Sequence, residues 1–194
     1  MVIRQVVNTV FNSCSYVISH DGTSWLVDCG DIDKLLPLVD GRLSGVMLTH
    51  AHFDHIYGLN HLEALIPGVP VLTNAAGREA LLSDKLNFSR YHEEPFILDM
   101  PEVIKVVPDG TDVKLFDGIH AQAIYTPGHS PDCVTWRVGM ALFTGDSYIP
   151  GVKIVTNFPH SDKDLALRSR DRILDLAEGC QLYPGHPAHE DVEI

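Results

Sequence analysis

The sequence predicts one α/β (α+β) domain, residues 1–194, in which helices cover the outer faces of two packed β-sheets. Short β-rich segments cluster in two rounds, and helical segments fall between the clusters. One β-rich segment runs directly into THAHFDHIYG, which holds four metal-capable side chains within six residues. The chain has no low-complexity linker, and 194 residues are enough for one compact core.

The first round of elements combines five short strands with three helices. The strands that we expect are Val2–Val7, Ser15–Ser19, Ser24–Asp28, Gly45–Leu48 and Pro70–Thr73. Asp21-Gly22 predicts a hairpin turn between the second and third of these. The expected helices are Asp31–Val39, which Pro37 interrupts, Leu59–Ile66, which ends at Pro67-Gly68, and a helix through Leu82 that Asn74 caps.

The second round begins after a mixed segment, Ser83–Pro101, which we expect to be a loop that borders a pocket. The strands expected here are Val103–Val107, Val113–Phe116, His120–Tyr125, Cys133–Val138, Ala141–Thr144 and Cys180–Tyr183, with a hairpin turn at Gly139. The clearest helix is Ser161–Ala177, for which Ser161 is the expected N-cap. Gly179 lies just past its end.

Composition and charge exclude several classes of partner. A net charge of −12 disfavours a nucleic-acid or anionic-membrane surface, because both need basic patches. The four cysteines are scattered without a C-x-x-C pair, which indicates free thiols in a reducing compartment. The N-terminus lacks a signal-peptide pattern and no run reaches membrane-spanning length, so we expect a cytoplasmic protein that acts on a small molecule. The sequence does not indicate an oligomeric state.

The H-x-H-x-D-H motif has partners elsewhere in the chain. Three further segments each place a ligand-type residue after a strand and a glycine turn: Tyr-Thr-Pro-Gly-His129, Phe-Thr-Gly-Asp146 and Tyr-Pro-Gly-His186. Glycine lets the chain turn sharply where a strand ends, which presents the next side chain at the rim of the sheet. The H-x-H-x-D-H motif has little reason to occur as a solvated loop, and the three further patterns follow it in order, so we interpret all four as one metal centre.

Local geometry divides the candidate ligands between two ions. Alternate residues of an extended segment share a face, so His50 and His52 can hold one ion together, and His129 would complete this site 1. Asp54 and His55 follow where the chain curls towards a helix, and with His186 they form site 2. The two oxygens of Asp146 can bridge both ions. Histidine and carboxylate ligands favour Zn²⁺ and also suit Fe or Mn. We expect no ligand role for the other histidines: His20, His61, His92, His120, His160 and His189.

These motifs resemble those of the metallo-β-lactamase fold superfamily, a four-layer αββα sandwich of two mixed β-sheets. Within it, the ligand pattern is similar to that of the glyoxalase II group, because Asp146 stands where zinc β-lactamases usually carry cysteine. The resemblance implies that Asp28 supports the histidine loop. It also implies that the helical C-terminal domain of glyoxalase II is missing, which leaves Lys153 and Arg90 as candidate substrate contacts.

The resemblance and the ligand set together predict a dinuclear hydrolase. A hydroxide that bridges the two ions would attack a carbonyl carbon, and Asp54 would bind metal and orient that hydroxide. A thioester is the first choice of substrate, because a thiolate leaves without help from an acid. Another bond (a β-lactam, a lactone or a small phosphodiester), a mononuclear iron persulfide dioxygenase and a non-enzymatic metal-binding module are the alternatives. Specificity is expected to come from the loops Phe11–Ser13, Ser83–Pro101 and Ser147–His160.

Overall fold

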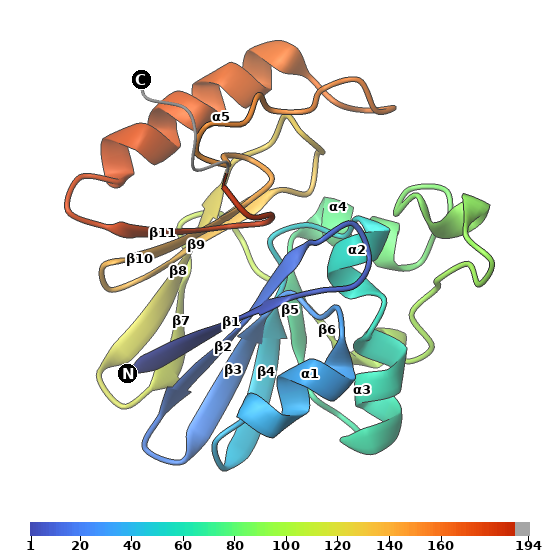
Figure 1. Cartoon of the computed structure of the whole chain (residues 1–194), viewed down its shortest axis with the longest axis vertical. Coiled ribbons are helices and arrows are strands. Elements are labelled where there is room, and N and C mark those ends of the chain that lie inside the picture. Colours follow the sequence, from blue (N-terminus) through green and yellow to red (C-terminus); the bar gives the residue numbers. More distant parts are fainter. Residues whose placement is uncertain (189–194) are drawn as a thin grey trace.

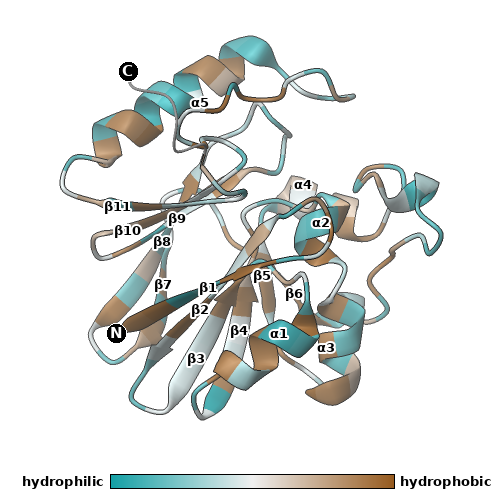
Figure 2. Cartoon of the chain, viewed as in Figure 1, coloured by the Kyte–Doolittle hydropathy of each residue, from teal (hydrophilic) through white to brown (hydrophobic). Residues whose placement is uncertain are grey.

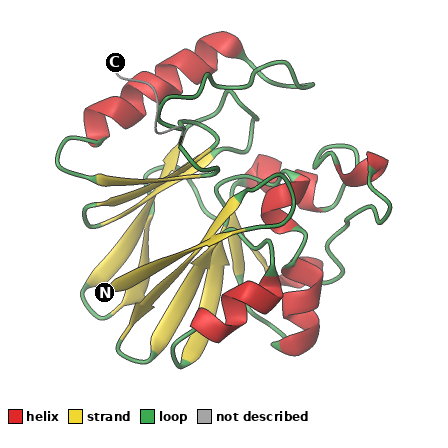
Figure 3. Ribbon diagram, in the orientation of Figure 1, coloured by secondary structure: helices red, strands yellow, loops and turns green. Residues whose placement is uncertain are grey.

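Two mixed β-sheets face each other in the computed structural model, which describes residues 1–188 (Figures 1 and 3). In that range the first sheet has the order β1-β2-β3-β4-β5-β6, with strands Val2–Val7, Cys14–His20, Thr23–Val27, Arg42–Met47, Val71–Thr73 and Ile104–Val106. Strands β1 to β3 pair antiparallel, and β3 to β6 pair in parallel. Parallel neighbours need long crossover connections, and helices α1 to α4 lie in those connections.

The second sheet is antiparallel except at one edge. Over the described residues its order is β11-β10-β9-β8-β7, and its strands in chain order are Asp112–Phe116, Ile119–Tyr125, Val134–Val138, Ala141–Gly145 and Gln181–Pro184. Strand β11 joins β10 in parallel after the chain has crossed back through helix α5, Lys163–Leu176. Because β11 runs parallel to β10, the residues that follow these two strands lie at the same end of the sheet.

The core between the sheets contains both tryptophans of the chain. The indole of Trp25, on β3, donates a hydrogen bond to the carbonyl oxygen of Leu115 on β7, 3.1 Å away. The indole of Trp136, on β9, donates to the carbonyl oxygen of Leu48 at the end of β4, at 2.8 Å. Each indole therefore satisfies its N–H on the opposite sheet, which fixes how the two sheets lie against each other.

Helices cover the outer face of each sheet, as the sequence predicts (Figure 1). Helices α1 (Ile32–Leu35), α2 (Phe53–Ile56), α3 (Leu59–Leu65) and α4 (Ala75–Leu81) accompany the first sheet. Helix α5 covers the second sheet through Ala166, Ser169 and Ile173, while hydrophilic residues on its other faces meet solvent (Figure 2). The layers run helix, sheet, sheet, helix, which confirms the expected fold class.

Several expected boundaries need correction. Strand β4 begins at Arg42 rather than Gly45, because Arg42 and Leu43 already pair with β3. The N-cap of α5 is Asp162 and not Ser161, since the Asp162 carboxylate accepts the Leu165 N–H at 2.9 Å. The expected Asp31–Val39 helix is α1 followed by a separate 3₁₀ turn at Leu36–Leu38 that contains Pro37.

The expected loop Ser83–Pro101 contains a further 3₁₀ turn at Ser89–Tyr91, and another, Pro101–Val103, begins at its last residue. This segment does border a cavity, through Phe88 and His92. Within residues 1–188, none of the helices has both the length and the apolar character that a membrane crossing requires.

Candidate metal centre

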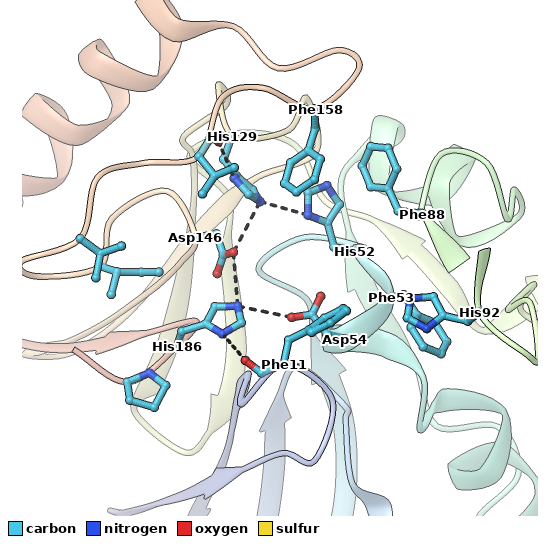
Figure 4. Close-up of a pocket in the computed structure, with 14 residues that line it drawn as sticks. Phe11, His52, Phe53, Asp54, Phe88, His92, His129, Asp146, Phe158 and His186 are labelled. Atoms are coloured by element: carbon cyan, nitrogen blue, oxygen red, sulfur yellow. Dashed lines mark hydrogen bonds and ion pairs between the residues drawn. The ribbon is translucent and has the colours of Figure 1, made fainter. Parts of the chain in front are cut away.

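All seven predicted ligands meet at one rim of the sandwich, and Figure 4 shows His52, Asp54, His129, Asp146 and His186 among them. His50 and His52 follow β4, and the one-turn helix α2 presents Asp54 and His55. The remaining three each follow a strand of the second sheet: His129 after β8, Asp146 after β10 and His186 after β11. The backbone of His52 is extended (φ −68°, ψ 147°) and α2 begins at the next residue, so the motif changes direction between its second and third ligands, as expected.

The ligands form three overlapping groups. They are His50-His52-His129, His50-His55-Asp146 and Asp54-His55-His186, and within each group one donor atom per residue lies within 4.8 Å of the others. The first and third groups match the three protein ligands predicted for each site alone. The second group connects Asp146 to members of both.

Hydrogen bonds fix the orientation of the imidazole rings. His129 Nδ1 faces the Val155 carbonyl oxygen at 2.8 Å, and His186 Nδ1 faces that of Phe11 at 3.2 Å. A carbonyl oxygen only accepts, so each Nδ1 donates a proton and each Nε2 points into the centre, where His129 Nε2 lies 3.0 Å from His52 Nδ1. His55 Nδ1 is held in the same way by the Asp28 carboxylate at 2.9 Å.

The residues fit divalent ions in both their chemistry and their spacing. Among the seven ligands, His50 Nε2, His52 Nε2, His55 Nε2 and Asp146 Oδ1 are buried without a hydrogen-bond partner. The Nε2 atom of His186 lies 3.3 Å from Asp54 Oδ2 and 3.5 Å from Asp146 Oδ2. These gaps are long for hydrogen bonds, but ligands on one tetrahedral Zn²⁺ with bonds of 2.0–2.1 Å lie about 3.3 Å apart. The donor set therefore suits one cation at the first group and another at the third.

Charge at the centre is divided between the ligands. Burial, with smaller contributions from neighbouring histidines, lowers the pKa of His50 well below its ordinary value and that of His52 to about 4. Burial also lowers the pKa of His186, but the carboxylates of Asp146 and Asp54 outweigh it and raise that pKa to about 10. Burial raises the pKa of Asp146, yet His186 and His55 hold it well below its usual range. The aspartates are thus anionic, and a bound cation would replace the protons of the nearby imidazoles.

Asp28 supports the histidine loop in the way that the resemblance implies. Its buried carboxylate accepts the Thr49 N–H and the Thr49 hydroxyl, both at 2.7 Å, as well as His55 Nδ1. The backbone of Asp28 is left-handed (φ 58°), an uncommon conformation for a non-glycine residue. This conformation at the end of β3 places the carboxylate under the next loop.

A second carboxylate, Asp132, also supports the histidine loop, and the sequence does not predict this role. It is buried, accepts the Ala51 N–H at 2.6 Å and is bonded by the Ser130 hydroxyl. Ala51 lies between His50 and His52, so Asp132 ties the turn that carries His129 to the first histidine pair. The sequence Ser130-Pro131-Asp132 gives no sign of this, because a short polar turn is common in any loop.

Helix α5 positions His129 from the outside. The Ser161 hydroxyl donates to the His129 carbonyl oxygen at 2.6 Å, and the Asp162 N–H donates to Gly128 at 2.8 Å. Gly128 has φ 138°, and a Cβ atom there would collide with the backbone of Ala166. The glycine in this turn is therefore needed for the approach of α5 as well as for the turn itself.

A cavity of about 490 Å³ opens beside the centre. Its walls come from the three loops named in the sequence analysis, through Phe11, through Phe88 and His92, and through residues between Ile149 and Phe158. His92, for which no ligand role is expected, packs against Phe53 with ring centroids 4.2 Å apart and the ring planes tilted by 36°. Nothing in the sequence near His92 reveals this contact.

The two candidate substrate contacts lie outside this cavity. Arg90 is exposed and forms an ion pair with Asp84 at 2.9 Å. Lys153 lines a crevice of about 20 Å³ that also touches His129 and Asp146. Of the histidines expected to be no ligands, His20, His61, His120 and His160 lie outside the three groups, and His189 lies outside the described residues.

Comparisons with known proteins agree on the family. Residues 8–186 match the family profile described as the metallo-beta-lactamase superfamily. A hydroxyacylglutathione hydrolase from Hydrogenovibrio crunogenus is 28% identical over 173 residues, which cover 87% of this chain and 55% of that protein. Hydroxyacylglutathione hydrolase GloC from Haemophilus influenzae is 24% identical, covering 93% of this chain and 87% of that one.

The crystal structure of the BLEG-1 B3 metallo-beta-lactamase superposes with a TM-score of 0.84 at 25% identity, over 95% of this chain and 91% of that one. This chain spans about half the length of several curated relatives that it matches, the hydrolase from Hydrogenovibrio crunogenus among them.

Proposed function

The chain belongs to the metallo-beta-lactamase superfamily, and on this premise we propose that it is a metal-dependent hydrolase that cleaves thioesters with two divalent ions. One observation carries the proposal: seven side chains from both sheets converge with their donor atoms unpaired or facing one another. His50, His52 and His129 would hold one ion, Asp54, His55 and His186 the other, and Asp146 would contact both. Zn²⁺ is the first choice of ion, and Fe or Mn would fit the same donors.

Divalent ions held by these residues would supply an activated water, with a pKa of roughly 7, and would polarise a carbonyl group. The residues of the chain supply positioning. His129 and His186 are fixed by the carbonyl oxygens of Val155 and Phe11, and His55 is fixed by Asp28. Asp54 has one oxygen facing His186 at 3.3 Å, and its other oxygen can accept a hydrogen bond from the attacking water.

Thioester hydrolysis makes the smallest demand on this arrangement. Water adds to the acyl carbon, a C–O bond forms, the C–S bond breaks, and the products are a carboxylate, a thiol and one proton. A thiol has a pKa of about 8.5, so its sulfur can leave as the anion without a general acid. The names of the two hydroxyacylglutathione hydrolases support the same bond type.

The test is a metal analysis of the purified protein together with a panel of substrates that differ only in the bond cleaved. We expect close to two ions per chain and turnover of thioesters that exceeds turnover of lactones, β-lactams and phosphodiesters. Asp146→Ala should lose metal and activity together, whereas His61→Ala, an exposed histidine outside the centre, should keep both. Oxygen uptake with a persulfide but no hydrolysis would instead identify a dioxygenase and refute the proposal.

A further inference from the structure

We propose that the cavity beside the metal centre selects thioesters with an apolar acyl group, aromatic or of medium chain length, and a thiol part without charge. This inference deepens the proposed function and rests on it. It concerns the part of the substrate that does not react, which the walls of the cavity must recognise.

The walls next to the metal-binding histidines are aromatic. Four of the chain's seven phenylalanines line the cavity: Phe11, Phe53, Phe88 and Phe158. The Phe88 and Phe158 rings lie 5.2 Å apart, and they approach the His52 ring to 4.9 Å and 5.5 Å (Figure 4). An acyl group whose carbonyl carbon reaches the centre would lie against these two rings.

The apolar surface continues at Phe53 and Phe11. The ring centroid of His92 lies 4.2 Å from that of Phe53 and 5.9 Å from that of Phe11, and Figure 4 shows Phe53 and His92 on the same side of the centre as Phe88. Ile149, Val152 and Val155 contribute the remaining side. Water makes few hydrogen bonds to such apolar walls. An apolar group that displaces this water therefore gains a binding free energy of about 25 cal/mol per Å² of apolar area buried.

Across residues 1–188, neither a lysine nor an arginine lines the cavity, where it could bind an anionic thiol. The titratable groups on the walls in that range are Asp54, Asp146, His52, His92, His129 and His186. Arg90 is already paired with Asp84. Lys153 lines two smaller pockets, of about 20 Å³ and about 130 Å³, and does not line the cavity itself. A thiol with two carboxylates, such as glutathione, would bury them unpaired here, which is costly.

The backbone is strained where two of the phenylalanines project. Phe11 and Phe88 have φ of 52° and 62°, the left-handed region in which a bulky residue is rarely found. The rest of the fold has to offset this strain, so the positions of these two rings are enforced. Phe11 and Phe88 both line the cavity, so this backbone strain is the second observation in favour of a specific apolar binding site.

The first experiment compares thioesters that share the neutral thiol N-acetylcysteamine and differ in the acyl group. With each rate divided by the hydroxide-catalysed rate of the same ester, we expect kcat/KM for the phenylacetyl ester to exceed that for the lactoyl ester at least tenfold. Changing the thiol of the phenylacetyl ester to glutathione should lower kcat/KM. Equal or reversed preferences, with thioesters still hydrolysed, would overturn the inference and leave the proposed function intact.

Variants then locate the preference. Phe158→Ala should lower the ratio of kcat/KM for the phenylacetyl ester to kcat/KM for the lactoyl ester about tenfold. Phe158 is 40% exposed, so its loss leaves the core intact. Tyr91→Ala is the matched control, because Tyr91 is an aromatic residue of the neighbouring loop that is 91% exposed and does not line the cavity. A parallel loss for both esters in Phe158→Ala would contradict the assignment.

Binding gives a readout that does not depend on which bond is cleaved. Isothermal titration of the zinc-loaded protein with phenylacetate and with lactate should give at least tenfold tighter binding of phenylacetate, and Phe158→Ala should reduce that ratio. If no thioester is cleaved but this ratio is observed, the proposed reaction fails and the apolar site stands. If lactate binds as tightly as phenylacetate, the inference is wrong whatever the reaction.

Discussion

Replacing Asp28 with asparagine tests how the histidine loop is held. The Asp28 carboxylate accepts three hydrogen bonds, two from Thr49 and one from His55 Nδ1. Asparagine keeps one oxygen, which can still accept the Thr49 N–H, but it places an NH₂ group near His55 Nδ1. Two donors cannot bond to each other, so His55 has to move its own proton from Nδ1 to Nε2.

The moved proton then sits on the atom that would bind metal. A hydrogen bond to a charged group contributes about 1.5–3 kcal/mol, which corresponds to roughly 10–100-fold in an equilibrium constant. Loss of an outer partner of a metal-binding histidine has an effect of the same size. We therefore expect Asp28→Asn to fold, to keep the ion at His50, His52 and His129, and to bind the second ion about 10–100-fold more weakly.

The assay is a titration with zinc buffered by a chelator, in which bound metal is counted at each free concentration. Asp31→Asn is the matched control: it makes the same chemical change three residues further along, away from the seven ligands. Asp28→Ala is less informative, because three buried donors without partners would cost about 3–9 kcal/mol, most of the stability of a small domain. Two ions bound with wild-type affinity in Asp28→Asn would refute the tautomer argument.

Three further predictions concern the same framework. Asp146→Ala should lower the metal content from about two ions to less than one and reduce kcat by at least a thousandfold; full occupancy by two ions would contradict the bridging role. Treatment with a chelator should abolish activity, and added Zn²⁺ should restore it without a denaturation step; activity that survives complete metal removal would exclude a metal-dependent reaction. Burial raises the pKa of Asp31, but hydrogen bonds from Lys34, Tyr57 and Thr9 outweigh it and lower that pKa to about 2. This carboxylate therefore stabilises the fold above its unfolded pKa of about 3.9, and its contribution disappears as the pH falls through 2. Urea unfolding of the chelator-treated protein should show Asp31→Asn less stable than wild type by about 1–2 kcal/mol at pH 6, with the gap closing near pH 2; a gap that does not change with pH would refute the linkage.

The parts of the centre that the sequence predicts are those encoded locally. His50, His52, Asp54 and His55 lie in one segment whose spacing determines which residues share a face. The three other candidates follow a strand and a glycine, a pattern that places a side chain at a sheet rim wherever it occurs. Their convergence follows because strand ends of a sandwich share one edge.

The parts that the sequence does not predict depend on contacts between distant segments. Asp132 bonds to Ala51 across 81 positions, and no local pattern marks it. His92 has its place because the loop after α4 folds back onto Phe53. At the start of α5, Ser161 and Asp162 are both good caps, and Ser161 is instead used to hold the His129 turn. Local propensity allows either residue to cap the helix, and the hydrogen bond between Ser161 and His129 determines that Asp162 does so.

The two indole hydrogen bonds between the sheets have a consequence for the metal centre. They set the separation of the sheets at two buried points, through Leu115 and Leu48, without any help from the ligand residues. Leu48 lies only two positions before His50, so the packing of the apolar core also fixes the distance between the ligands of the two sheets. The distance between the two sheets would therefore not depend on the bound ions, and exchanging one kind of cation for another need not change the packing of the sheets.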